Sequence, residues 1–96
     1  MLTACGQPTI ENIVLANKNV EYVINVERYV KKIMLQVREF KELLVAFKQG
    51  ETNTNYFTIK SGCTYYEDNV QGPFIMAVCA TEDNTTIEYI TWKHWD

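Results

Sequence analysis

Residues 26–49 read VERYVKKIMLQVREFKELLVAFKQ, and the spacing of their apolar side chains decides the predicted fold. Apolar residues recur at alternating steps of four and three, at Val26, Val30, Ile33, Val37, Phe40, Leu44 and Phe47. Such steps place side chains on one face of an α-helix. Asn25 supplies an N-cap, and Gly50 can adopt the left-handed conformation that ends a helix. The stretch therefore predicts one long amphipathic helix.

The segment before this helix, residues 10–26, allows two interpretations. Helical spacing can be threaded through four apolar residues, Ile10, Ile13, Val20 and Val23. Residues 13–15 and 20–26 are dense in β-branched side chains, however, and the polar residues 17–19 between them are typical of a turn. The second pattern favours two strands that pair around this turn as a hairpin.

Three strands are predicted after the helix, over residues 56–66, 74–80 and 85–93. Gly62 indicates a bulge or bend in the first of them. Residues 74–80 are continuously apolar, which is typical of a central strand covered on both faces. The predicted fold class is α+β, a single domain over residues 1–96 with one long amphipathic helix on an antiparallel sheet. The favoured order is ββαβββ, with αβββ as the alternative.

A short segment around the predicted end of the helix resembles the cystatins, a family of protease inhibitors. Lys48-Gln49, followed after five residues by Asn55-Tyr56-Phe57, is similar to the cystatin segment Lys-Gln-Val-Val-Ala-Gly-x-Asn-Tyr-Phe. The early Gly6 and a helix-then-sheet order also fit. The resemblance implies a cystatin-like fold whose hairpin loop enters a protease cleft. Residues 50–53 replace the apolar part of that loop, so no inhibitory residue is carried over.

Charge is distributed unevenly along the 96 residues, whose formal net charge is −3. Residues 1–50 carry seven basic and five acidic side chains, whereas residues 51–96 carry two basic and seven acidic ones. The acidic half also holds eight of the twelve aromatic residues. A nucleic-acid-binding surface combines aromatic residues with Lys and Arg. The pattern therefore disfavours direct nucleic-acid binding and favours a protein partner with a basic surface.

The three cysteines, Cys5, Cys63 and Cys79, leave at least one thiol unpaired within the chain. If residues 63 and 79 lie on a hairpin that turns near Val70, their Cα atoms are about 7–10 Å apart. A disulfide requires a separation within about 7 Å. Free thiols in a reducing cytoplasm are therefore favoured, and a bridged pair would need a shifted register or a bulge.

The first residues of the sequence favour a location outside the cytoplasm. Leu2-Thr3-Ala4-Cys5 resembles the lipobox of bacterial lipoproteins, in which the cysteine is modified by lipid. Only four residues precede Cys5, fewer than an export signal contains. We therefore favour the cytoplasm and keep an exported, lipid-anchored protein as the alternative. No stretch approaches the roughly 18 apolar residues of a membrane-spanning helix.

The sequence contains no motif for catalysis, a metal or a cofactor. His94 is the only histidine, and no Cys-x-x-Cys or His-x-x-x-His spacing offers a zinc site. The glycines are isolated, so no phosphate-binding loop is present. Adjacent acidic pairs such as Glu82-Asp83 are typical of solvated turns, whereas an acid–base pair converges across a cleft. We therefore expect no enzymatic activity and no cofactor.

The remaining candidate function is binding through acidic and aromatic residues of the second half. The predicted partner-binding residues are Tyr65, Tyr66, Glu67, Asp68, Glu88, Trp92 and Trp95. In a strand Glu88, Ile90 and Trp92 share one face and Ile87 and Tyr89 the other, while Tyr65 and Tyr66 point to opposite faces. Tyr and Trp dominate interface hot spots.

These residues predict a small non-enzymatic protein that occupies a partner's surface, of the inhibitor type that phages and mobile elements encode. The alternative is an exported lipoprotein or a cystatin-like inhibitor module. A homodimer through the amphipathic helix and strand addition at a sheet edge also remain open.

Overall fold

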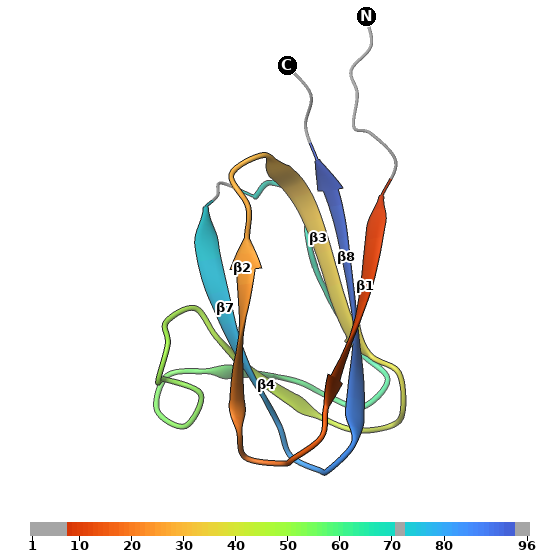
Figure 1. The fold of residues 1–96 in the computed structure, drawn as a ribbon, viewed down its shortest axis with the longest axis vertical. Helices are drawn as coiled ribbons and strands as arrows, with labels where there is room; N and C mark the ends of the chain where they lie inside the picture. The colour runs from red at the N-terminus through yellow and green to blue at the C-terminus, as the bar shows by residue number, and fades with distance from the viewer. Residues whose placement is uncertain (1–7, 71–72, 94–96) are drawn as a thin grey trace, which may run out of the picture.

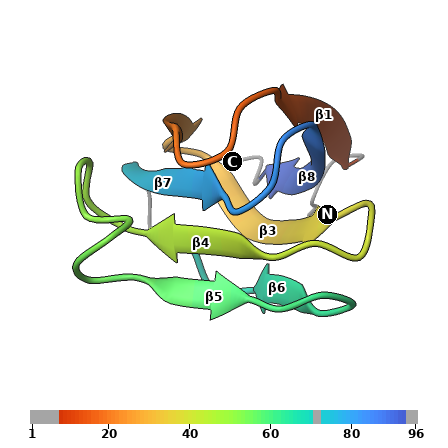
Figure 2. The same cartoon turned by 90° about the horizontal axis from the view of Figure 1, so that it is seen from below.

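The structure is a computed structural model that describes residues 8–70 and 73–93, and these residues form an all-β fold. Its eight strands are β1 (Thr9–Leu15), β2 (Glu21–Val26), β3 (Val30–Val37), β4 (Leu43–Ala46), β5 (Phe57–Ile59), β6 (Thr64–Glu67), β7 (Phe74–Ala80) and β8 (Thr85–Lys93). The first sheet has the strand order β1-β8-β3-β6, and the second has the order β2-β7-β4-β5. The two sheets face each other as the layers of a sandwich (Figure 1, Figure 2).

The strands pair as one long hairpin that is rolled into two layers. β4 pairs with β5, β3 with β6, β2 with β7, and β1 with β8, all antiparallel. Successive pairs belong alternately to the second and the first sheet. Within the first sheet β3 also pairs with β8, and within the second sheet β4 also pairs with β7. This is the topology of a jelly roll. The first and last strands are consequently neighbours, with Thr9 opposite Thr91.

The predicted α+β fold is wrong, because residues 8–70 and 73–93 contain no helix. The predicted helix over residues 26–49 is instead the end of β2, all of β3 and all of β4. Both predicted orders, ββαβββ and αβββ, are therefore excluded, and so is a cystatin-like fold. The segment that resembles the cystatins forms the loop between β4 and β5, residues 47–56, and the first residue of β5.

A β-bulge explains why strands can have a helix-like apolar spacing. A step of four residues returns to the same face of a strand as well as of a helix, so Ile33 and Val37 share a side of β3. The step of three from Val30 to Ile33 is accommodated by a register shift between Val30 and Lys32. Both Val30 and Ile33 are therefore buried. Phe40, which the helix would have buried, lies between β3 and β4 and is 87% exposed.

The strands predicted on either side of this stretch exist, but several pair differently. Residues 10–26 do contain two strands, β1 and β2, yet these belong to different sheets and form no hairpin with each other. The predicted strand over residues 56–66 is two strands, β5 and β6, which also lie in different sheets. Gly62, predicted as a bulge or bend within one strand, lies in the turn that separates the two strands and has a positive φ of 82°.

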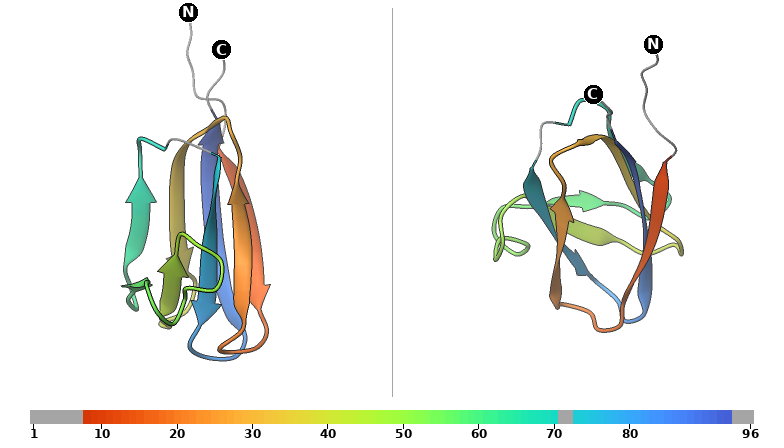
Figure 3. Two further views of the ribbon diagram at one scale, coloured as in Figure 1. Left: turned by 90° about the vertical axis from the view of Figure 1, so that its left-hand side faces the viewer. Right: turned by 45° about the horizontal axis from the view of Figure 1, so that its top comes forward.

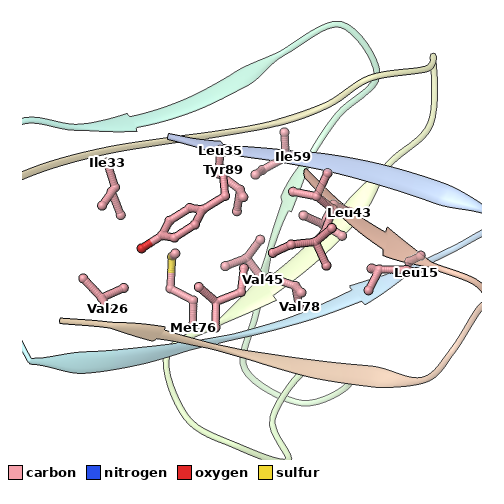
Figure 4. Packing of buried hydrophobic residues seen from close by; sticks show 14 of the residues in the cluster. Leu15, Val26, Ile33, Leu35, Leu43, Val45, Ile59, Met76, Val78 and Tyr89 are labelled. Carbon is pink, nitrogen blue, oxygen red and sulfur yellow. The ribbon is translucent and has the colours of Figure 1, made fainter. Parts of the chain in front are cut away.

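The predictions for β7 and β8 are confirmed, including the central position of β7 between β2 and β4. The inner face of β7 contributes Met76 and Val78 to the core between the sheets (Figure 4). Its outer face is also covered, since Ala77 is fully buried and Cys79 is 7% exposed. Coverage on both sides explains why this strand is continuously apolar.

Candidate functional site

The loop of residues 47–56 covers part of the outer face of the second sheet. Glu21 on β2 holds this loop, because its carboxylate accepts hydrogen bonds from the Gly50 amide at 2.8 Å and from the Thr52 hydroxyl at 2.8 Å. A recess of about 360 Å³ lies between the loop and the sheet and is lined by Glu21, Thr52 and Cys79 among others. Figure 3 shows the loop lying against this layer. The outer face of the first sheet carries no comparable loop among the described residues.

Side chains of β8 alternate between the core and the outer face of the first sheet. Ile87 and Tyr89 are buried, whereas Glu88, Ile90 and Trp92 are partly exposed on the outer side. This division confirms the one predicted from the sequence. Because β8 lies between β1 and β3, its outer side chains occupy the middle of the face.

A line of apolar side chains crosses all four strands of this face. The register places Ile10 of β1 opposite Ile90 of β8. Met34 of β3 lies opposite Ile90 on one side and Tyr66 of β6 on the other. Ile10 is 65% exposed and Tyr66 is 48% exposed. We call Ile10, Ile90, Met34 and Tyr66 the apolar row, and Trp92 lies beside it on the same face, two residues further along β8.

A second line of side chains, parallel to the apolar row, is entirely polar and hydrogen-bonded. Glu88 accepts hydrogen bonds from Gln36 Nε2 at 2.6 Å and from Arg38 Nε at 2.9 Å. Arg38 also donates to Asn12 Oδ1 at 2.9 Å, and the Thr64 hydroxyl donates to Gln36 Oε1 at 3.1 Å. This polar row, Asn12, Arg38, Glu88, Gln36 and Thr64, therefore spans the same four strands and borders the apolar row.

The polar row neutralises the charge of Glu88. The hydrogen bonds from Gln36 and then Arg38 lower the pKa of Glu88 below its usual value, so the carboxylate is ionised at neutral pH. Its charge is balanced by Arg38 in an ion pair of 2.9 Å. Glu88 thus lies on the predicted surface, but its partner is within the chain.

Tyr65 and Tyr66 point to opposite faces of β6, as predicted. Tyr66 belongs to the apolar row, whereas Tyr65 faces the interior and packs against the core. Its ring centroid lies 5.1 Å from that of Phe57 and 6.5 Å from that of Phe47. Burial, and secondarily the charge of Glu67, raises the pKa of Tyr65. Tyr65 is therefore partly buried against the core at the side of the sandwich between β5 and β6 and does not lie on the outer face of the first sheet.

The other predicted acidic residues, Glu67 and Asp68, lie together where β6 ends. Glu67 ends β6 opposite the buried Ile33, and Asp68 is exposed in the bend that follows. Glu82 and Asp83, which the sequence predicted as a solvated turn and not as part of the site, lie in the connection between β7 and β8, at the opposite end of the sandwich. Asp83 accepts a hydrogen bond there from the Lys18 amide at 2.8 Å. Trp95, the remaining predicted residue, lies outside the described residues.

The two described cysteines are both free, Cys63 on the surface and Cys79 buried. They cannot be neighbours on one hairpin, because β6 and β7 belong to different sheets. Burial, followed by the charge of Glu21, raises the pKa of Cys79, so this thiol is protonated at neutral pH. Cys5 and His94 lie outside the described residues.

The described residues include no cluster of three or more His, Cys, Asp or Glu side chains that could hold a metal ion. A search of the same residues for a helix long and apolar enough to cross a membrane also finds none. The outer face of the first sheet, with its apolar row and its polar row, is therefore the candidate functional site.

No protein-family model, curated protein or solved structure matches this chain.

Sequence reasoning found Tyr66, Glu88 and Trp92 of this face but missed the rest of both rows. Met34 and Gln36 alternate with the buried Ile33 and Leu35, and this period of two is the signal that identifies them. The longer helix-like pattern obscured that alternation. No local signal exists for Ile10, because its neighbour Ile90 is 80 positions away in the sequence.

Proposed function

We propose that this protein is a non-enzymatic binding domain that occupies the surface of a partner protein, as an inhibitor or antagonist does. Its contact surface is the outer face of the first sheet. The observation that carries this proposal is the apolar row, in which four strands each contribute one apolar side chain to a continuous exposed line.

The composition of the face supports a protein partner. Tyr66 and Trp92 are the residue types that most often supply binding energy at protein interfaces, and Met34 adapts its shape to a partner. The polar row is joined by hydrogen bonds within the chain, so a partner that covers it has fewer unpaired polar groups to satisfy. An apolar centre beside a polar border is the usual anatomy of an interface.

The size of the face indicates how the partner binds. Four strands about 4.8 Å apart and about seven residues long give a face of roughly 400 Å². A stable interface buries about 800 Å² on each partner. A homodimer through this face alone would therefore be small, and we favour a different protein that also contacts the loops at its border. Glu67 and Asp68, where β6 ends, are the acidic groups placed to meet basic residues of that partner.

Affinity capture with matched variants tests the proposal. Ile90→Lys and Met34→Lys place a charge in the middle of the apolar row, where binding would have to bury it. We expect both to reduce the captured partner at least tenfold, as measured by quantitative mass spectrometry. Phe40→Lys is the control, since it alters a more exposed apolar residue outside this face. Thermal unfolding of each variant confirms that it is folded.

A second arm of the experiment tests the charge of the partner. The double reversal Glu67→Lys with Asp68→Lys should weaken capture and make it less sensitive to salt. Unchanged capture by Ile90→Lys and Met34→Lys would show that the outer face of the first sheet is not the binding surface.

A further inference from the structure

A recess of about 150 Å³ opens between the two sheets at the end where β1 begins and β8 ends. It is separate from the outer face of the first sheet, because the residues of β1 and β8 that line it alternate with those of the apolar row. Two carboxylates, Glu11 and Glu27, form part of its wall together with Lys93 and Tyr89. A volume of 150 Å³ accommodates about five water molecules. It is therefore large enough for a ligand of three to five heavy atoms.

The hydroxyl of Tyr89 opens onto this recess and has no hydrogen-bond partner among residues 8–70 and 73–93. Tyr89 is only 5% exposed. Every fully buried side-chain oxygen or nitrogen among the described residues has a hydrogen-bond partner. The Tyr89 hydroxyl has none, so it is not fully buried and is accessible from the recess. Figure 4 shows the ring directed from β8 toward Val26 and Ile33, at this end of the sandwich. Because the rest of this side chain is buried, a ligand can reach the hydroxyl only from within the recess.

The charges around the recess favour a cation. Lys93 Nζ already forms an ion pair with Glu27 Oε1 at 2.7 Å, so one ammonium group is bound at the wall. Glu11 lies directly opposite Tyr89 in the β1–β8 register and forms no ion pair with any described residue. Burial, then Glu11 and then Glu27, raises the pKa of Tyr89 to about 12. The hydroxyl is therefore neutral at pH 7 and lies in the negative potential of both carboxylates.

We propose that this recess binds a small primary ammonium ion, with Glu11 as its counter-ion and the Tyr89 hydroxyl as a hydrogen-bond acceptor. The three N–H groups of a primary ammonium satisfy acceptors that a quaternary ammonium leaves unpaired. A short alkyl chain fits the remaining volume against Val30. This site does not depend on the proposed protein-binding function.

The test is a titration of the folded, full-length chain with ethylammonium chloride, followed by the amide chemical shifts in two-dimensional NMR spectra. We expect saturable shifts for Glu11 and Thr91 beside the recess and none for Thr64 on the far strand of the first sheet. Sodium chloride at the same ionic strength and tetramethylammonium chloride are the control titrations, and neither should produce the same saturable shifts.

Three variants complete the test. Tyr89→Phe removes only the hydroxyl and Glu11→Gln only the charge, and each should weaken the affinity for ethylammonium at least tenfold. Tyr66→Phe removes a hydroxyl on the outer face and should leave that affinity unchanged. Glu11 is exposed, so Glu11→Gln provides a result even if Tyr89→Phe disturbs the core. Equal shifts with tetramethylammonium, or unchanged affinity in Glu11→Gln, would overturn the proposal.

Discussion

Glu21 determines the position of the longest connection in the described fold. Its carboxylate joins β2 to the loop of residues 47–56 through the Gly50 amide and the Thr52 hydroxyl. These two hydrogen bonds, that of Gly50 first, lower the pKa of Glu21 below its ordinary value of 4.5. A single side chain thus keeps one outer face of the sandwich covered while the other stays open.

The lowered pKa of Glu21 predicts an acid sensitivity. The unfolded chain binds a proton at Glu21 at a higher pH than the folded chain does, so the hydrogen-bonded carboxylate stabilises the fold fully above about pH 4.5. This contribution is lost as the pH falls through the folded-state pKa. We expect wild type to lose more unfolding free energy than Glu21→Gln between pH 7 and pH 3, measured by urea denaturation. Equal losses in the two proteins would contradict this role.

Among the elements, β3 shows how a sequence pattern can be right about burial and wrong about conformation. Val30 and Ile33 are buried, as the helical pattern predicted, but they are buried by a strand with a bulge. The β-branched residues in the stretch favour an extended chain. The β-branched residues therefore did indicate a strand. The prediction gave more weight to the apolar spacing, which fits a helix and also a strand with a bulge.

The strand and the helix make different predictions for two apolar residues of this stretch. Ile33 is fully buried, so Ile33→Ala should cost about 2–5 kcal/mol of unfolding free energy. Phe40 is 87% exposed, so Phe40→Ala should change that free energy by no more than about 0.5 kcal/mol. A helix packed through its apolar face would give large losses for both. Chemical denaturation of the two variants decides between the structures.

The elements that sequence analysis located correctly are those with an unambiguous local pattern. β8 alternates over nine residues and β7 is continuously apolar, and both were placed with their observed bounds. The short strands β5 and β6 were merged, because three or four residues give too little periodicity to separate them. Pairing was not predictable locally, since the turn between β1 and β2 resembles that of a hairpin but connects two sheets.

At the scale of the molecule, the candidate site exists only after the whole chain has folded. The apolar row takes one residue from each of β1, β8, β3 and β6, which lie far apart in the sequence. The sequence could identify the outer side of β8, and hence Glu88 and Trp92, but not the neighbours that complete the row. It also could not show that Arg38 neutralises Glu88.

The same topology predicts slow folding. The β1–β8 pair joins residues 9–15 with residues 85–91, and the pairs β2–β7, β3–β6 and β4–β5 nest inside it. Closing such long loops before their contacts form is entropically costly, so folding takes milliseconds to seconds in domains of this kind. Stopped-flow tryptophan fluorescence, with Trp92 as a probe, should show refolding in that range. Microsecond refolding would contradict the nested pairing.

The pairing of the first strand with the last also allows the chain to be circularly permuted. Thr9 and Thr91 face each other across β1 and β8, at a separation of about 5 Å between paired strands. A short peptide linker from residue 93 to residue 8 would therefore close the described strands into a ring of backbone. New ends could then be opened in the exposed turn at Phe40, giving a circular permutant that keeps every strand pair.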